Sequence, residues 1–406
     1  MKKIITILLI VFVATAFVVY FNYNHTDIPK LYLDGDITSM VSKSETSDIS
    51  FHYVNGKQDI VGFAEIKYQG TSSMGYDKKN YTLKFFSDVG HKDKLQIDVG
   101  WGPQSKYCMK ANWIDRTHAR NVVSAKLVAQ MQKKYGLFTE APNNGAIDGF
   151  PVEIYNNGKF HGLYTFNIPK DEWLFAMDSD NPNHIVICGE GWDDANLFKA
   201  MPDFDTWAVE VGEESEYTQQ KMDRLFDFII NSTDEQFKDD IGQYLNLDSV
   251  LNYYVFTDLA YLKDNCGKNM LIATYDGCVW FLSLYDLDTS WGTNYTGREL
   301  WQYKDSLVNL SRNRLFERIE TCFPKELANR YFELRESILS NGNIMAEFHT
   351  FKDQIPVMTF VKETLRWGQG IIKSPGDIPG YDYDQIEEYL HVVQERLDAK
   401  YQAMLN

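Results

Sequence analysis

The segment DNCGKNMLIATYDGCVWFLSLYDLD, residues 264–288, decides how the second half of this 406-residue chain folds. Two apolar runs in it flank the dipeptide Asp276-Gly277, which is a strong signal for a two-residue β-hairpin turn. Antiparallel strands return the chain to the point where the first strand began. We therefore expect Asn269 and Asp286, which bracket the hairpin, to lie close together.

The same segment holds carboxylates and an amide at a spacing that suits phosphoryl transfer. Asp264 stands five positions before Asn269, and the hairpin ends in Asp286 and Asp288. Phosphoryl transfer uses a carboxylate that orients and deprotonates the acceptor hydroxyl, together with amide and carboxylate oxygens that bind the metal ions on the phosphates. Protein kinases place a D-x-x-x-x-N loop before a hairpin and a metal-binding aspartate after it.

These residues therefore receive separate predicted roles. We predict Asp264 as the catalytic carboxylate, and Asn269 and Asp286 as metal ligands. For Asp288 two interpretations stay open, because this side chain could be a further metal ligand or could cap the turn that follows.

The sequence on either side of this segment differs in character. Strand-like alternation indicates two β-hairpins upstream, over residues 63–85 and around the Asn-Gly turn within 151–166. Apolar residues at helical spacing, ending at Gly136, predict one helix over 116–135. Downstream, helices are expected over residues 213–229 and 247–262, and over most of the chain beyond 311.

The predicted fold class is α+β, a divergent two-lobed protein-kinase-like fold with a β-rich N-terminal half and a mainly helical C-terminal half. In such a layout a nucleotide binds in the cleft between the halves. We divide the chain into an N-terminal segment, residues 1–27, and one domain, residues 28–406. Within the domain the β-rich lobe covers 28–185 and the helical lobe covers 186–406.

Composition limits the possible partners. The 57 acidic residues outnumber the 40 basic ones, which gives a formal charge of -17 and argues against nucleic acid as a partner. A hydrophobic content of 44% supports a real core. The five cysteines form no C-x-x-C pair, so a zinc ribbon or a thioredoxin-like motif is not expected.

The N-terminus carries a targeting segment. Lys2 and Lys3 precede an uncharged run over residues 4–21, which reaches the lower end of the length that spans a bilayer. The segment is either cleaved after the ATA motif at 14–16 or retained as an anchor, and we favour the anchor because the apolar run continues past the motif. In both cases the body lies outside the cytoplasm, and membrane contact is expected through this segment only.

Several short motifs are spread along the chain from about Tyr68 to the C-terminus. They are QGTSS at 69–73, KKNYTLK at 78–84, ANWID at 111–115 with Arg120-Asn121, HGLY at 161–164 and YDLDTSWG at 285–292. Together these motifs resemble the CotH family, the spore-coat kinases and their relatives, and the likeness is specific only because they occur together. Asn167 is a departure from the family pattern, since an acidic residue is expected near this position.

The resemblance implies an atypical protein kinase that uses ATP with Mg²⁺ or Mn²⁺ and transfers phosphate to Ser or Thr of surface or spore-coat proteins. It also implies that a lysine within 78–84 contacts the phosphates. We prefer Lys84 slightly over Lys79, because YTLK repeats the V-A-I-K pattern of a strand lysine. The further expected contacts to the nucleotide are Ser72, Ser73 and Arg120.

Two other function classes are kept beside the kinase. One is a catalytically inactive scaffold or adhesin on the cell or spore surface, which would show no metal-dependent binding of nucleotide. The other is a hydrolase that uses Asp264 and Asp286 as paired carboxylates, which would need a sugar-sized groove and no ATP.

Overall fold

The computed structural model describes residues 28–70, 72–371 and 383–406. The expected N-terminal anchor, residues 1–27, lies outside the described residues. In the described ranges, no helix combines the length and the hydrophobicity that a membrane crossing requires.

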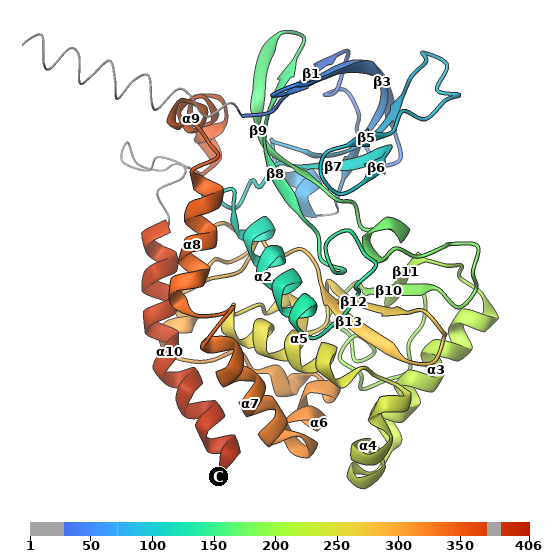
Figure 1. The fold of residues 1–406 in the computed structure, drawn as a ribbon, viewed down its shortest axis with the longest axis vertical. Helices are drawn as coiled ribbons and strands as arrows, with labels where there is room; N and C mark the ends of the chain where they lie inside the picture. The colour runs from blue at the N-terminus through green and yellow to red at the C-terminus, as the bar shows by residue number, and fades with distance from the viewer. Residues whose placement is uncertain (1–27, 71, 372–382) are drawn as a thin grey trace, which may run out of the picture.

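In the described part of the chain, seven strands of the N-terminal half close into a barrel (Figure 1). Their order is β1-β2-β3-β4-β7-β9-β8, and every neighbouring pair is antiparallel except β1 and β8, which are parallel. Closure leaves no unpaired sheet edge. The strands are β1 (Lys30–Asp34), β2 (Thr46–Asn55), β3 (Gln58–Gln69), β4 (Asn80–Phe86), β7 (Lys106–Lys110), β8 (Gly149–Asn156) and β9 (Lys159–Asn167).

Alternation along the strands fills the barrel with apolar and aromatic side chains. Tyr107 and Phe166 pack with ring centroids 4.7 Å apart, and Phe150 stacks on Phe166 at 5.2 Å. Both hairpins expected from the sequence are confirmed, as β3–β4 and β8–β9. The turn between β8 and β9 has positive φ at Asn157 and Gly158, which explains the Asn-Gly pair.

The second half combines a four-stranded sheet with helices, so the mixed α+β class with a helical C-terminal half is confirmed (Figure 1). The sheet order is β11-β10-β12-β13, and all its described pairs are antiparallel. Its strands are β10 (Ile185–Gly189), β11 (Trp207–Val211), β12 (Met270–Thr274) and β13 (Trp280–Leu284). A short ribbon, β5 (Ile97–Asp98) with β6 (Pro103–Gln104), accompanies the barrel.

The helices pack around α5, which is buried from Ser249 to its last residue, Leu259. Asn246 caps α5, since its side-chain oxygen accepts the Ser249 N–H at 2.9 Å. Asp258 of α5 accepts hydrogen bonds from Lys400 at 2.8 Å and from Tyr401 at 2.9 Å, which ties the last helix to the core. The helices are α2 (Arg120–Lys134), α3 (Glu216–Asn231), α4 (Asp234–Asp240), α5 (Leu247–Leu259), α6 (Arg314–Cys322), α7 (Pro324–Arg335), α8 (Asn341–Lys352), α9 (Val357–Ile371) and α10 (Tyr383–Leu405).

Helix α9 leaves the helical half and packs on the barrel (Figure 1). The Thr359 hydroxyl donates to a Glu153 carboxylate oxygen on β8 at 2.6 Å. The Trp367 indole N–H donates to the His161 carbonyl on β9 at 2.7 Å. A segment from late in the chain therefore completes the outer wall of the N-terminal barrel.

The hairpin expected within residues 264–288 is confirmed as β12–β13, in which Met270 pairs with Leu284. Asp276 supports its turn, because one carboxylate oxygen accepts the N–H groups of Cys278 at 2.7 Å and Val279 at 2.8 Å. Partial burial opposes ionisation of Asp276, but these N–H groups outweigh it and hold the pKa of its carboxyl below the usual value.

We expect Asp276→Ala to lower the free energy of unfolding by about 1 kcal/mol at pH 7. A carboxyl with a lowered folded-state pKa stabilises above its unfolded pKa of about 3.9 and loses this contribution as the pH falls through the folded value. The gap to the unsubstituted protein, measured by urea unfolding, should therefore shrink from pH 7 towards pH 3. Asp239→Ala on the exposed face of α4 is the control, and a pH-independent gap for Asp276 would contradict this account.

Candidate functional site

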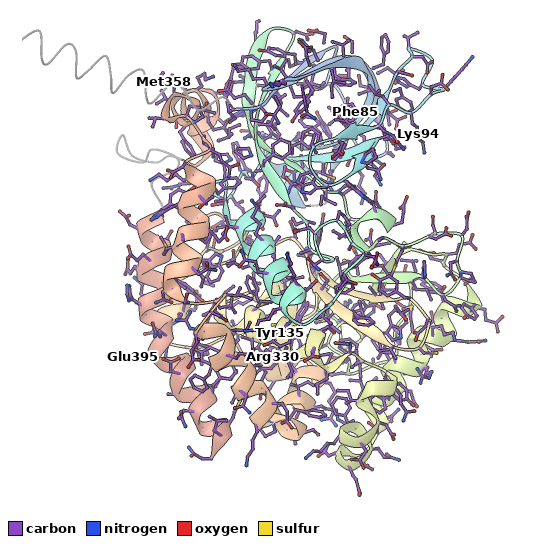
Figure 2. All side chains as sticks on the ribbon, in the orientation of Figure 1. Phe85, Lys94, Tyr135, Arg330, Met358 and Glu395 are labelled. Carbon is purple, nitrogen blue, oxygen red and sulfur yellow. The ribbon has the colours of Figure 1, made fainter. Side chains whose placement is uncertain are left out.

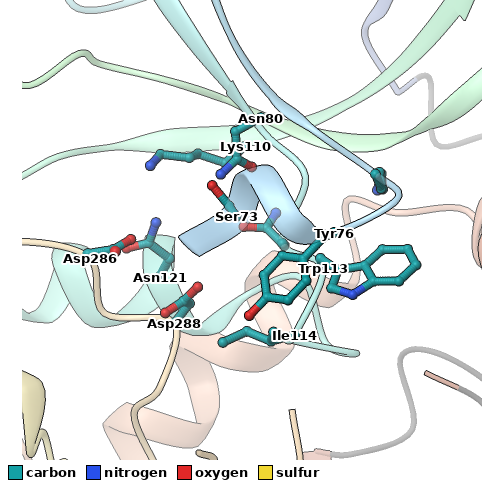
Figure 3. A pocket seen from close by; sticks show the side chains of 11 residues that line it. Ser73, Tyr76, Asn80, Lys110, Trp113, Ile114, Asn121, Asp286 and Asp288 are labelled. Carbon is teal, nitrogen blue, oxygen red and sulfur yellow. The ribbon is translucent and has the colours of Figure 1, made fainter. Parts of the chain in front are cut away.

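A narrow pocket lies where the barrel meets α2 and the segment after β13 (Figure 3). Its empty volume, which includes open solvent at the mouth, is about 350 Å³. Three of its lining residues, Ser73, Asp286 and Asp288, are among the predicted site residues, and Lys78 lies in the span 78–84 in which a phosphate-binding lysine is expected. The lining residues are Ser73, Tyr76, Lys78, Asn80, Lys110, Asn112, Trp113, Ile114, Asn121, Asp286 and Asp288.

The segment after β13 directs two carboxylates into the pocket. Asp286 and Asp288 line it, whereas Leu287 between them is fully buried in the core. Asn121, the second residue of α2, accepts the Leu287 N–H on its side-chain oxygen at 3.0 Å. Asp286 also adopts a left-handed backbone with φ 58°. Helix α2 and the hairpin therefore position both aspartates together.

The carboxylates of the site interact strongly. Burial raises the pKa of the Asp288 carboxyl well above its usual value, and the charges of Asp286 and Asp264 add to the effect while Lys110 opposes it. Burial also raises the pKa of Asp264, with Lys268 opposing and Asp286 contributing. Repulsion between carboxylates of this kind is relieved by a bound cation. The donor set therefore fits a divalent metal ion.

Lys110, the last residue of β7, lines the pocket together with these carboxylates (Figure 3). Burial alone would lower its pKa, but the charges of Tyr285, Asp286, Cys108 and others outweigh burial and raise the pKa above its usual value. Within the described residues, the Lys110 ammonium group makes one hydrogen bond, which is long, at 3.4 Å to the Tyr285 hydroxyl. An ammonium group has three donors, so this side chain retains donors for an anion.

Lys78 also lines the pocket, but its ammonium group is fully engaged. It is 1% exposed and donates to the carbonyls of Ala111 at 2.9 Å and Leu163 at 2.5 Å. Its third bond is to a carboxylate oxygen of Glu363 on α9 at 2.6 Å. The other Glu363 oxygen accepts the Leu163 N–H at 2.7 Å. Lys78 and Glu363 therefore join β9, the end of β7 and α9 behind the pocket.

Aromatic side chains cover the mouth of the pocket. Tyr76 stacks near Trp113 with ring centroids 6.2 Å apart, and its hydroxyl donates to the Tyr295 carbonyl at 3.1 Å. Gly297 packs closely against the same region, because a Cβ atom added to Gly297 would lie 2.6 Å from the Ile114 carbonyl oxygen. The segment after the two aspartates thus contacts the barrel side of the site.

The structure brings Asp264 and Asn269 to the same region without placing either among the described lining residues. Asp264 begins the 3₁₀ turn η4 (Asp264–Cys266) and is close enough to Asp286 to raise its own pKa through that charge. Asn269 directly precedes β12, and its N–H donates to the Gly189 carbonyl at 2.8 Å. The pairing of Met270 with Leu284 sets Asn269 at the hairpin end from which Asp286 emerges.

The structure does not bring the predicted lysines into the pocket. Lys84 lies on the outer face of β4, is 46% exposed at its side chain and pairs with Glu65 at 3.3 Å. Lys79 donates to the carbonyls of Met74, at 2.8 Å, and Tyr76, so it braces the loop between β3 and β4. Lys84 shares the outer face of the sheet with Lys110, but it lies four residues along β4 from Asn80, which lines the pocket, so position along the strand keeps Lys84 out of the lining.

Arg120 and Ser72 have different outcomes. Arg120 is 1% exposed, and its guanidinium donates to a carboxylate oxygen of Asp115 at 2.6 Å and to the Ser290 carbonyl at 3.2 Å. These bonds connect the start of α2 to the segment after the aspartates. Arg120 is not among the described residues that line the pocket. Ser72 begins the 3₁₀ turn η1 (Ser72–Gly75), but its side chain lies outside the described part of the chain. The Ser73 hydroxyl donates to the Gln69 carbonyl at 3.1 Å.

Lys110 and Asn121 were missed as individual site residues. The run YCMK, residues 107–110, repeats the strand-lysine pattern as well as YTLK does, and Lys110 directly precedes the ANWID motif. In the sequence Asn121 stands out only as the neighbour of Arg120. The two lysine strands cannot be told apart by sequence pattern, and only the folded chain shows that Lys110 lines the pocket and that Asn121 accepts the Leu287 N–H.

We expect Glu363→Ala to lower the free energy of unfolding by about 3 kcal/mol, because it leaves the buried Lys78 ammonium without a counter-charge. Urea unfolding monitored by tryptophan fluorescence measures this loss. The matched control is Glu317→Ala, which removes a surface pair with Arg314 and should change stability by less than about 0.5 kcal/mol. Equal losses of stability for the two substitutions would show that the buried pair contributes no more to the free energy of unfolding than the surface pair.

Comparison with known proteins agrees with the likeness noted in the sequence. Residues 66–399 match the family described as CotH kinase protein, so the match covers most of the chain, from β3 into α10. No curated protein matches the chain. The family match supports a kinase-like protein, and such proteins in general use ATP with a divalent metal. The chain therefore belongs to the CotH kinase family.

Proposed function

We propose that this protein is an ATP-dependent phosphotransferase with a divergent, two-lobed kinase-like fold, which phosphorylates Ser or Thr hydroxyls of surface or coat proteins. The observation that carries this proposal is the meeting of Lys110 with Asp286 and Asp288 in one pocket between the barrel and the helical half. We further propose that residues 1–27 are retained as a membrane anchor and that the body lies outside the cytoplasm.

In this proposal Asp286, Asp288 and Asn269 hold the metal. Carboxylate and amide oxygens are the ligands that Mg²⁺ and Mn²⁺ prefer. When bound, the metal would neutralise charge on the phosphates. Asn121 keeps its place in the pocket by accepting the Leu287 N–H, and so fixes the backbone between the two aspartates. Burial, and after it the charge of Asp286, raises the pKa of the Asp288 carboxyl, and a bound cation would oppose both effects.

The remaining roles follow from charge and position. Lys110 binds a phosphate oxygen, because its ammonium group retains donors that the described residues do not use. Asp264 orients the acceptor hydroxyl and accepts its proton, and the raised pKa of its carboxyl makes it a better base than an exposed aspartate. Positioning and charge neutralisation then supply most of the catalysis.

We expect Asp264→Asn to reduce phosphate transfer at least about 100-fold while metal-dependent binding of ATP is kept. Asp286→Asn should abolish both transfer and binding, because it removes a metal ligand. The measurements are incorporation of labelled phosphate and calorimetry with ATP and Mg²⁺ or Mn²⁺, using the full chain. Asp239→Asn is the control. Absence of metal-dependent heat in the unsubstituted protein would favour the scaffold or adhesin, and transfer unchanged in both variants would refute the assignment.

Lys110 and Lys84 offer a matched pair of substitutions. We expect Lys110→Met to weaken ATP binding about 10- to 100-fold, as the loss of a charged hydrogen bond predicts. Lys84→Met should leave binding unchanged, since Lys84 pairs with Glu65 on the barrel surface. Calorimetry measures the dissociation constant of ATP for each of the two variants. A larger effect at Lys84 than at Lys110 would contradict the placement of the phosphates beside β7.

A further inference from the structure

Helix α9 buries Phe360 in the core, but it also exposes apolar side chains on its outward side. Its barrel-facing side holds Thr359 and Glu363, which are 1% and 5% exposed and bind Glu153 and Lys78. Its outward side holds Met358 and Leu365, seven residues apart and therefore on one stripe, which are 50% and 83% exposed. Surface helices of globular proteins normally bury the apolar stripe and expose the polar one. The outward side of α9 is therefore apolar where water would favour polar groups.

The charges on α9 have one sign at its surface. Within residues 357–368 the sole carboxylate is Glu363, which is buried, and the other charged side chains are Lys362 and Arg366. Arg366 is exposed and lies over the Trp367 ring, 4.7 Å from its centroid. A helix surface without an exposed acid is unusual in a chain with a formal charge of -17. Apolar groups flanked by basic ones are typical of helices that lie on anionic lipid.

The chain places α9 close to the end of the N-terminal apolar run. The Glu153 N–H donates to the Pro29 carbonyl at 2.9 Å, and the Glu153 side chain binds α9 through Thr359 and Lys362. Only residues 22–27 separate the apolar run from Ile28, and this stretch spans at most about 25 Å when fully extended. An anchor formed by that run would keep the α9 side of the barrel near the bilayer surface.

The barrel surface beside α9 carries half-buried aromatic rings. Lys362 lies over the Phe160 ring at 4.8 Å and over the Tyr155 ring at 5.7 Å. Tyr155 in turn stacks on Tyr32 with ring centroids 5.0 Å apart. Aromatic and basic side chains of this kind are enriched where proteins meet the membrane–water interface.

We propose that the outward face of α9, formed by Val357, Met358 and Leu365 with Arg366, rests on the anionic lipid surface of the membrane that residues 1–27 enter. Figure 2 shows Met358 at the outer edge of the molecule. This proposal rests on retention of the anchor, not on the kinase activity. Contact with the membrane then extends beyond the N-terminal segment. A second protein copy fits less well, because stable protein interfaces use about 20 residues a side.

The test places a fluorescent probe on the full chain in nanodiscs that contain phosphatidylglycerol. Leu365→Cys carries the probe, and Val61→Cys is the matched control. Val61 is an apolar residue, 68% exposed, on β3, a strand that Figure 1 shows on the side of the barrel away from α9. Labelling of the unsubstituted chain corrects for its own cysteines, of which Cys108, Cys188, Cys266 and Cys322 are buried. Spin-labelled lipid and a water-soluble quencher report the surroundings of each probe.

We expect spin-labelled lipid to quench the probe at position 365 several-fold more than the probe at position 61. The water-soluble quencher should show the reverse order. Equal access of both probes to the water-soluble quencher would overturn the proposal. Shielding of position 365 that increases with protein concentration would also overturn it, because a second copy would then cover the face. Phosphate transfer is measured separately, so either proposal can fail alone.

Discussion

The antiparallel ladder between β12 and β13 is the constraint on which the candidate site depends. Asn269 and Asp286 are far apart in the sequence, and the ladder brings them to the same end of the hairpin because Met270 pairs with Leu284. The ladder alone does not direct the side chains, and a second contact is needed. Asn121 supplies it from the start of α2, where its amide oxygen accepts the Leu287 N–H. A local hairpin and one long-range hydrogen bond therefore define the acidic wall of the pocket.

The elements that the sequence predicted well are those set by local turns. The Asp-Gly and Asn-Gly hairpins need only two neighbouring strands, and both are present. Closure of the barrel could not be predicted in this way, because it depends on the parallel pairing of β1 with β8, more than a hundred residues apart. The start of α2 was predicted four residues early, since the turn before Arg120 is held by the Asp115 side chain and not by helical bonds.

The same distinction explains the site. Asp264, Asp286 and Asp288 could be selected from spacing around one hairpin, and the structure gathers them in one region. The lysine could not be chosen from a pattern, because YTLK and YCMK are equivalent as sequences. Only the barrel decides between them: Lys84 meets Glu65 on the outer surface, whereas Lys110 ends its strand beside the aspartates. Burial and strand direction, which are properties of the closed sheet, carry the missing information.

The pairing of Lys78 with Glu363 has a consequence for the order in which the chain can fold. Every strand of the barrel precedes residue 168, yet the carboxylate that neutralises the ammonium group in its wall comes from α9. A nascent chain emerges from its N-terminus, so the barrel would hold an uncompensated charge until almost the whole polypeptide had been synthesised. Such a delay would couple completion of the first half to arrival of the last helices.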